Sequence, residues 1–482
     1  MSSWAEAKWI SDNIISHIDQ RAMTIQPNDM KKFEIRNISD SSAGLKFLEP
    51  DDIRSGGHVI CKTKGVMIRM STKDYPQTIN DGDLVLVNTD IGKYNQEEYV
   101  VNGLSKDAIY YFTAFPFSTD NVYNMSQSDL NKVKTNTMPI YGIQRDITSS
   151  SPYWTRTHFA KGLSATASEG TIAGHSDFDN IYPWSDMKRT TIDTNEMVKI
   201  PLFHYRRYRE GNIEHIDICQ YSADGFSEHP GSGRFVGAYI TSDYSYKEHA
   251  QVGSNRYKTP YLYTDMLYQL SQTWDIGRYW RIIDIKTVSA LQMLFLVEFA
   301  CNNSQRIIGK VGLTDKYKET GECENVPNLT GIYTDLNGVK TVIYRGIENI
   351  WGNNYTWVDC VAKSWRSIYF SKKKSSIYNI NNYEIKKLDS YQKASYHISE
   401  NGYISQLGLD KNAPWLLLPE DAAGSDSTYF CDKIENKSDS TDLLKNFVWG
   451  GEGLFSFKIS YISEEDKYNT PYFSRLLYDP HE

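Results

Sequence analysis

Three acidic residues lie close together in one segment of the sequence and could support either of two kinds of chemistry. Asp177 and Asp179 are two residues apart, and Asp186 follows seven residues later. Glycoside hydrolysis needs two carboxyl groups roughly 5–10 Å apart, and calcium is bound through carboxylate oxygens. Alternatively, the aspartates could cap a turn before Asn180 and anchor the loop that leads to Trp184. We favour the structural interpretation and predict neither a catalytic residue nor a metal site here.

Other combinations of reactive residue types are missing from the sequence. Four of the ten histidines lie in one region at spacings of 11, 14 and 20 residues, which do not match the spacing of zinc ligands. The six cysteines include no Cys-x-x-Cys pair, so we expect reduced, mostly buried thiols. The sequence also lacks GxSxG, HExxH, P-loop and GxGxxG motifs. We therefore expect a protein that is not an enzyme and needs no cofactor.

Aromatic residues dominate the composition. The 482 residues include 35 Tyr, 18 Phe and 11 Trp, a content that argues against disorder over most of the chain and is typical of contact surfaces. The net charge of −8 is spread along the chain, which excludes nucleic-acid binding through a basic surface. The sequence has no run of 18 apolar residues and no signal-peptide pattern, so we expect cytoplasmic synthesis and no membrane insertion.

The elements that would position reactive side chains change in type along the chain. Residues 1–30 begin with an apolar stripe at helical spacing, formed by Ala7, Ile10, Ile14 and Ile18. This stripe predicts a short helix. The helix could pack on its own domain, or it could serve as an attachment or oligomerisation segment.

Residues 31–137 switch to a period of two and predict a β-sandwich. Val66, Ile68 and Met70 fall on one face of a strand, and a turn signal follows at residues 80–83. Later in this region, Gly103 and Leu104 precede a turn and a Tyr-Tyr-Phe-x-Ala strand. This pattern resembles the penultimate strands of fibronectin type III modules, in which a Tyr holds the preceding corner. The resemblance implies an Ig-like spacer domain, and its residues are Gly103, Leu104, Tyr110, Tyr111, Phe112 and Ala114.

Residues 138–482 read as one large α+β unit with long loops. Helices are predicted over residues 263–274 and 288–300, and the second is apolar almost all round, so it should be buried. Short aromatic strands are predicted at 203–205, 235–240 and 279–282. The stretch from residue 364 to 387 resembles a surface excursion.

Four segments of this unit, in order, resemble the large C-type-lectin-fold domain at the tips of bacteriophage tail fibres and receptor-binding proteins, including major tropism determinants. They span residues 176–189, 289–305, 346–359 and 474–478. The last two also resemble motifs of formylglycine-generating enzymes, but those enzymes need a cysteine pair where this chain has Cys431 alone. The resemblance therefore implies the fold without the activity. The structural motif residues are Trp184, Asn349, Trp351, Gly352, Asn353, Trp357, Asp359 and Arg475.

Receptor contact is expected in an insertion into the lectin fold at about residues 364–450. Its Tyr and Trp residues alternate with Ser, Asn and Lys, a mixture typical of binding surfaces. The alternative is that these rings merely cover the domain. The receptor-binding candidates are Trp365, Tyr369, Tyr378, Tyr383 and Trp415.

Together these features predict a phage virion protein, a tail fibre or receptor-binding protein that recognises a bacterial surface glycan or protein. Its N-terminal region would join other virion proteins. Because fibres are symmetric, we expect a homo-oligomer and specifically a trimer. The alternative is a structural virion component, such as a head fibre, baseplate or decoration protein, that binds only other virion proteins. A receptor binder would expose its aromatic loops, whereas a structural component would bury them against neighbouring subunits.

Overall fold

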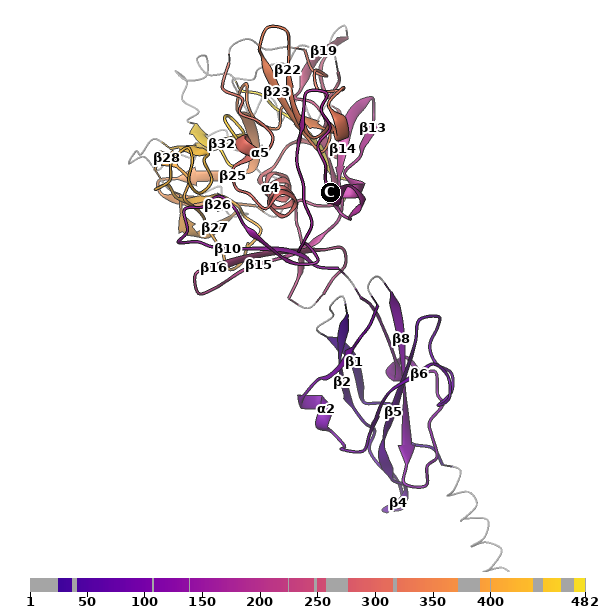
Figure 1. Ribbon diagram of the computed structural model, residues 1–482. Helices are drawn as coiled ribbons and strands as arrows, with labels where there is room; N and C mark the ends of the chain where they lie inside the picture. Colours follow the sequence, from indigo (N-terminus) through magenta and orange to yellow (C-terminus); the bar gives the residue numbers. More distant parts are fainter. Residues whose placement is uncertain are drawn as a thin grey trace, which may run out of the picture. The chain divides into compact units, whose positions relative to one another are not determined.

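The computed structural model shows a mostly β protein with many sheets and few helices (Figure 1). It divides into two compact units with a boundary between Pro139 and Ile140. The structure describes residues 25–36, 41–105, 108–137, 139–223, 225–246, 249–256, 276–314, 319–371, 391–398, 400–436, 445–460 and 472–481. The apolar stripe of the predicted N-terminal helix and the predicted helix at 263–274 lie outside these residues, as do Tyr378 and Tyr383. Residues 25–30 of the expected N-terminal segment are described and are not helical. No helix in the described part is long and apolar enough to cross a membrane.

The first unit contains a three-stranded sheet of order β1-β2-β7 and a four-stranded sheet of order β6-β5-β8-β9. All neighbouring strands in both sheets are antiparallel. A short hairpin, β3-β4, and a one-turn helix, α2, lie outside the two sheets. The elements are β1 (Lys32–Arg36), β2 (Ser42–Leu48), β3 (Ile53–Ser55), β4 (His58–Cys61), β5 (Thr63–Ser71), β6 (Asp83–Asn88), α2 (Lys93–Gln96), β7 (Tyr99–Asn102), β8 (Ile109–Ser118) and β9 (Lys132–Asn136).

Alternate side chains on the strands of the two sheets pack together in one core. Val66 and Ile68 on β5 are fully buried, and they belong to the same apolar cluster as Phe47 on β2 and Phe112 on β8. Because successive side chains on a strand point to opposite faces, this burial confirms the predicted period of two.

Tyr110 holds the corner before β8. Its hydroxyl oxygen accepts a hydrogen bond of 2.7 Å from the backbone N–H of Ser105, and its ring is buried in the core. The hydrogen bond therefore fastens the turn that precedes β8 to the side chain of Tyr110. The prediction that a tyrosine fastens this turn is confirmed.

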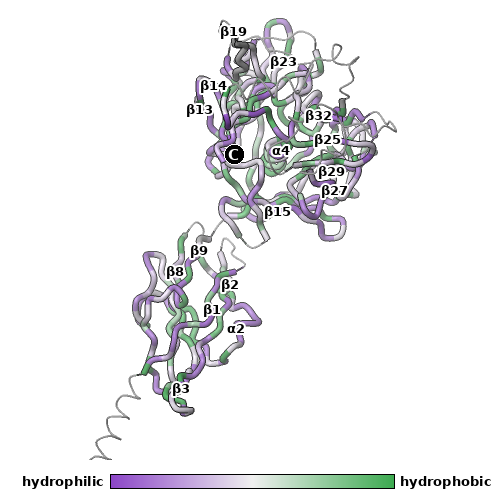
Figure 2. Tube along the Cα trace, turned by 180° about the vertical axis from the view of Figure 1, so that it is seen from behind, coloured by the Kyte–Doolittle hydropathy of each residue, from purple (hydrophilic) through white to green (hydrophobic). Residues whose placement is uncertain are grey.

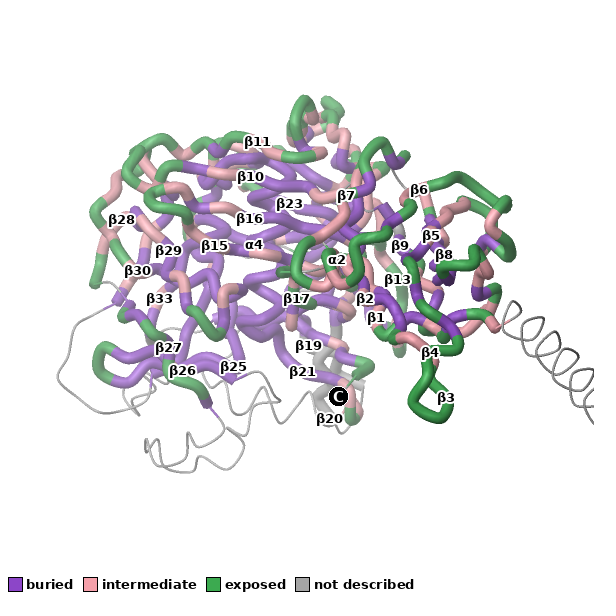
Figure 3. The backbone as a smooth tube through the Cα atoms, turned by 90° about the horizontal axis from the view of Figure 1, so that it is seen from below, coloured by how far each residue is buried: buried purple, intermediate pink, exposed green. Residues whose placement is uncertain are grey.

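The second unit surrounds one buried helix, α4 (Ile285–Phe299), with four larger sheets. The sheets have the orders β11-β10-β16-β15-β17, β12-β22-β23-β24, β13-β14-β18-β34-β21 and β27-β26-β25-β32-β33-β31-β28. Hydrophobic residues gather around α4, whereas hydrophilic residues dominate the peripheral loops (Figure 2). Helix α4 packs against β10, β16 and β25, and these elements form part of a largely buried block (Figure 3).

The strands of these sheets are mostly short. They are β10 (Tyr141–Asp146), β11 (Thr155–His158), β12 (Ser168–Glu169), β13 (Arg189–Ile192), β14 (Asn195–Ile200), β15 (His204–Glu210), β16 (Ile213–Cys219), β17 (Ser227–Glu228), β18 (Arg234–Gly237), β21 (Trp280–Ile282), β22 (Gly331–Thr334), β23 (Lys340–Tyr344), β24 (Ile347–Glu348), β25 (Thr356–Ser364), β26 (Ser367–Phe370), β27 (Gln392–His397), β28 (Gly402–Tyr403), β31 (Lys433–Glu435), β32 (Lys445–Trp449), β33 (Phe457–Ser460) and β34 (Leu476–Tyr478). Two small pairs, β19-β20 (Ser242–Tyr246 and His249–Gly253) and β29-β30 (Gln406–Leu407 and Pro419–Asp421), and a helical turn, α5 (Ser304–Ile307), complete the unit.

The boundaries of α4 follow from its end residues. The Asp284 carboxylate accepts a 2.8 Å hydrogen bond from the backbone N–H of Thr287 and so caps the first turn. The helix stops at Ala300, whose φ of 49° is left-handed. Every residue of α4 is buried, which confirms the prediction of a buried helix, although the helix begins three residues before Val288.

The described part of residues 364–450, where an insertion into the fold was expected, contributes to the main sheet and core of the second unit. Strands β26, β27, β28, β31 and β32 belong to the same sheet as β25. Trp415 and the three leucines that follow it are fully buried or nearly so, and they join the main core of the unit. The sequence pattern was misleading because the apolar run that follows Pro414 is short and stands among polar residues.

Candidate functional site

The loop that carries most of the lectin-like motif is buried and fixed by its own contacts. Trp351 is 1% exposed, and its indole N–H donates a 3.2 Å hydrogen bond to the carbonyl oxygen of Gly309. Trp357 is also buried and contacts Tyr472 edge to face at 5.0 Å. Both rings are therefore part of the core, and neither faces a ligand.

Three residues of this loop adopt left-handed backbone conformations. Asn349, Gly352 and Asn353 have φ angles of 50°, 86° and 63°. The Asn353 amide donates a 2.7 Å hydrogen bond to the side-chain oxygen of Asn349, which links the two turns. A Cβ atom at Gly352 would lie 2.5 Å from Val311, so both the close approach and the positive φ require glycine here.

Arg475 joins this loop to the end of the chain. It is 1% exposed, and its guanidinium donates to the backbone carbonyls of Gly237, Glu348 and Asn349 at 2.8, 2.6 and 3.0 Å. Burial lowers the pKa of Arg475 to about 9, because desolvation disfavours the charged form. Arg475 therefore fixes three separate backbone segments to one another.

The acidic residues that suggested catalysis are used in structural contacts. Asp177 accepts hydrogen bonds from the backbone N–H and hydroxyl of Ser164 at 2.7 and 3.1 Å and lies 3.0 Å from His175. Asp179 instead forms a 2.6 Å ion pair with Arg345. The two carboxylates thus have different partners. This agrees with the prediction that the aspartates anchor the loop that leads to Trp184. Trp184 is buried and donates to the Leu294 carbonyl at 3.1 Å.

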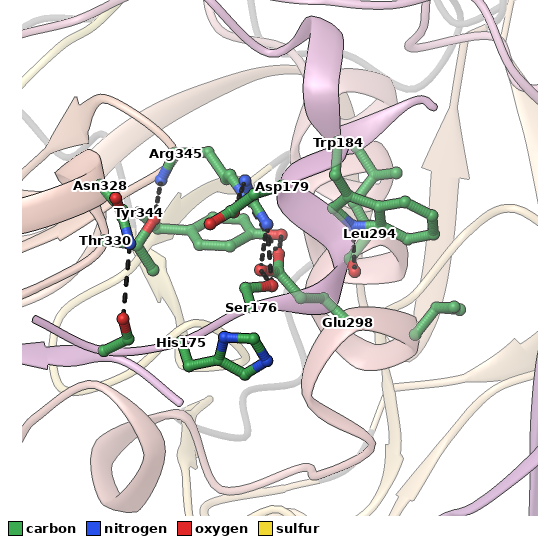
Figure 4. Close-up of polar contacts among 12 residues, drawn as sticks. His175, Ser176, Asp179, Trp184, Leu294, Glu298, Asn328, Thr330, Tyr344 and Arg345 are labelled. Carbon is green, nitrogen blue, oxygen red and sulfur yellow. Dashed lines mark hydrogen bonds and ion pairs between the residues drawn. The ribbon is translucent and has the colours of Figure 1, made fainter. Parts of the chain in front are cut away.

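Arg345 also binds Glu298, a fully buried carboxylate near the end of α4 (Figure 4). Glu298 accepts hydrogen bonds from the hydroxyls of Ser176 and Tyr344, each at 3.0 Å, and from Nε of Arg345 at 3.1 Å. A buried charge is stable only when it is paired and hydrogen-bonded. This cluster therefore connects the segments 176–189 and 289–305 to the end of β23 through their interior and has a structural role.

Two other buried carboxylates have strongly perturbed acidities. Burial raises the pKa of Glu348 and of Asp432 to about 7. Glu348 accepts the backbone N–H groups of Gly321 and Cys323 at 2.8 and 2.9 Å, and Asp432 accepts that of Phe455 at 2.8 Å. Perturbed acids are candidate catalytic groups, but the partners of both are backbone and core atoms.

The described residues provide neither a candidate metal site nor a reactive thiol. No group of three or more His, Cys, Asp or Glu among them is placed to hold a metal ion. All six cysteines are described, buried and free of disulfide bonds, as predicted. Burial raises the pKa of Cys301 to about 11 and that of Cys431 to about 12, so both thiols stay protonated at neutral pH.

The predicted receptor-binding aromatics have different environments. Trp365 is 56% exposed, and Tyr369 is half-buried. Trp415 is only 2% exposed and packs edge to face on Phe370 at 5.6 Å, so its assignment as a contact residue is wrong. Its indole ring fills the space behind the seven-stranded sheet, where no ligand can reach it.

Trp365 occupies the turn between β25 and β26 in a left-handed conformation, with a φ of 49°. The guanidinium carbon of the exposed Arg366 lies 6.0 Å from the centre of its ring. The Arg366 carbonyl oxygen lies 3.0 Å from Nδ1 of His397 on β27. Next along the sheet, Lys393 is paired in register with Tyr369, so these two side chains lie on the same face.

We call Trp365, Arg366, Tyr369, Lys393 and His397 the hairpin surface. Sequence reasoning found the two aromatic members and missed the three basic ones. Arg366 could have been noticed as the neighbour of Trp365, but Lys393 and His397 join the group only through the pairing of β26 with β27.

Comparison of the sequence with models of known protein families found no matching family, and comparison with curated proteins found no significant match.

Proposed function

We propose that this chain is a non-enzymatic phage virion protein, a tail fibre or receptor-binding protein that recognises the bacterial surface. The first unit would be a fibronectin type III-like spacer, and the second a C-type-lectin-fold recognition domain. The observation that carries this proposal is the contrast between the buried lectin-like motif and the exposed Trp365 turn. The side chains of the motif make contacts inside the unit, whereas the side chain of Trp365 is exposed to solvent and available to a partner.

The spacer assignment is supported by strand order and by one side chain. Antiparallel sheets of three and four strands, with orders β1-β2-β7 and β6-β5-β8-β9, match an immunoglobulin-like sandwich. Tyr110 supplies the corner contact of such modules.

The lectin-fold assignment is supported by the way that distant segments meet. Buried Arg475 bonds the segment 474–478 to the segment 346–359. Buried Glu298 bonds the segment 289–305 to Ser176 in the segment 176–189 and to Arg345, which directly precedes the segment 346–359. A scaffold of this kind positions loops and needs no chemistry of its own. We expect weak single contacts to gain strength from several copies of the chain in one assembly, with the N-terminal 30 residues forming the attachment and trimerisation segment.

Immunogold electron microscopy of purified phage particles with an antibody to this chain tests the proposal. Label at the end of a tail or fibre, together with binding of the fluorescent full-length protein to host cells, is the expected result. Label confined to the head or the interior of the baseplate, with no binding to cells, would favour a structural virion component instead.

A further inference from the structure

We infer that the hairpin surface, defined by Trp365, Arg366, Tyr369, Lys393 and His397, is the receptor-contact site and that its ligand is a polyanionic surface glycan. This inference rests on the proposed function and adds to it a site and a chemical class. The ligand would carry phosphate or carboxylate groups along a chain of sugar or polyol units.

The backbone at Trp365 is the first reason to assign a binding role to this turn. A bulky residue with φ near +50° is an outlier, since glycine or asparagine fits this conformation without strain. Such outliers cluster at binding sites, where the surrounding structure holds them in place. Here the result is a tryptophan ring that is 56% exposed at the end of a two-stranded hairpin.

The hairpin also fixes the backbone that carries this ring. Strand β26 pairs with β25 on one side and with β27 on the other. The contact between His397 and the Arg366 carbonyl then fastens the turn to β27. Tryptophan offers a large contact area at a small cost in side-chain entropy, and it is frequent among residues that dominate binding energy.

The positive charge of the hairpin surface is the second reason to assign a binding role to it. This charge also indicates that the ligand is anionic. Strands β26 and β27 contain Lys393 and His397 and no acidic residue, and the turn before them contributes Arg366. Among the described residues, the nearest exposed acid along the chain is Glu400, three residues beyond His397. The buried Asp410 also lies against β27, where its carboxylate accepts the backbone N–H of Ser395 at 2.6 Å. The whole chain carries a net charge of −8, so a basic surface of this size contrasts with the rest of the molecule.

Arginine next to an aromatic ring suits a charged glycan. The planar guanidinium donates two parallel hydrogen bonds to a carboxylate or phosphate, while the tryptophan face offers an apolar area to the ring or chain beside that group. Tyr369 and Lys393, side by side in register, repeat the combination of a ring and a cation one step along the sheet. A repeating polyanion would match this repeat.

The test uses the full-length protein and three polymers: a wall teichoic acid, which carries phosphate, a polygalacturonate, which carries carboxylate, and a neutral dextran. We expect binding to at least one polyanion and none to dextran. Raising the salt concentration from about 50 to about 300 mM should weaken that binding. Trp365→Gly and Arg366→Ala should each weaken it by roughly tenfold or more. Trp365→Gly suits its backbone conformation, so the variant should remain folded.

A matched control exists elsewhere in the same unit. Tyr153 is 48% exposed and lies 5.7 Å from the guanidinium of Arg306, which makes it a second exposed pair of a ring and an arginine. The double variant Tyr153→Ala/Arg306→Ala should bind the polyanion as the parent does.

The outcomes separate this inference from the proposed function. If the parent and the Trp365 variant bind host cells equally well, recognition lies elsewhere and only the site is wrong. If dextran binds as tightly as the polyanions, or if salt has no effect, the ligand class is wrong. If the parent binds neither cells nor any polymer, the proposed function fails together with the inference.

Discussion

Arg207 and Glu214 form an ion pair between β15 and β16 that is buried almost completely. Nε and Nη2 of Arg207 donate to one oxygen of Glu214 at 2.9 and 2.6 Å, and Arg145 donates to the other at 3.2 and 3.0 Å. The remaining Arg207 donor bonds reach carbonyl oxygens between Leu407 and Leu416. The pair therefore fixes the later part of the unit to a sheet formed near its beginning.

Glu214→Gln should lower the free energy of unfolding by roughly 3–5 kcal/mol, because the change leaves two buried guanidinium groups without their counter-ion. Chemical denaturation at pH 7 measures this loss. As a control, Glu196→Gln removes the partly exposed pair with Arg256 and should cost less than about 1 kcal/mol. Equal losses of unfolding free energy in the two variants would show that the buried ion pair contributes no more to stability than the partly exposed one.

The same pair predicts acid sensitivity. Burial alone would raise the pKa of Glu214, but Arg207 and Arg145 outweigh it and hold the pKa at about 2. The unfolded state therefore binds a proton before the folded state does. The stability supplied by this group is present above about pH 4.5 and disappears as the pH falls toward 2. Unfolding curves of the parent and Glu214→Gln should converge over this window, and a constant gap would contradict the prediction.

The contribution of Asp432 to the free energy of unfolding should depend on pH in the opposite direction, and at higher pH. Burial raises its pKa from 3.8 to about 7, so the folded state holds the proton more tightly than the unfolded state. The contribution of this group to stability should fall as the pH rises from about 4 to about 7, by on the order of 4 kcal/mol at roughly 1.4 kcal/mol per pKa unit. The difference in unfolding free energy between the parent and Asp432→Asn isolates this effect. A difference that does not change with pH would show that Asp432 is ionised in both states.

Trp351→Ala should unfold the second unit instead of weakening binding alone, because truncating a buried tryptophan typically costs about 3–5 kcal/mol. Gly352→Ala should also be destabilising, since its Cβ would meet Val311 at 2.5 Å with a φ of 86°. Calorimetry and cell binding are measured on the same samples. A variant that melts normally and no longer binds cells would place the ligand site in this loop and contradict its structural role.

Tyr110→Phe should destabilise the first unit by about 1 kcal/mol, because it removes the hydrogen bond that the N–H of Ser105 donates to the Tyr110 hydroxyl. Tyr111→Phe, on the neighbouring residue of the same strand, is the control and should cost less. If the two units unfold in separate transitions, Tyr110→Phe should lower the midpoint of the first unit's transition and leave that of the second unit unchanged. An unchanged first transition would mean that the corner contact does not contribute to stability.

The sequence alone determined the features that depend on short-range periodicity and local chemistry. Alternation at Val66 and Ile68 specified a strand with one buried face, and the continuous apolar stretch around Leu291 specified a buried helix. The resemblance of residues 103–114 to fibronectin type III modules implied a corner held by tyrosine. Each prediction holds because the required residues lie within one strand, one helix or one turn, where the geometry of the backbone fixes their relative positions.

Tertiary structure decided which side chains face solvent and which distant residues meet. Trp365 and Trp415 look alike in the sequence, yet one is 56% exposed and the other 2%. The difference arises because Trp415 packs on Phe370 in the core, whereas Trp365 lies in the exposed turn between β25 and β26. Lys393 likewise reaches Tyr369 only through pairing of β26 with β27. Burial and contact between such residues depend on the packing of segments far apart in the chain, which a local pattern cannot specify.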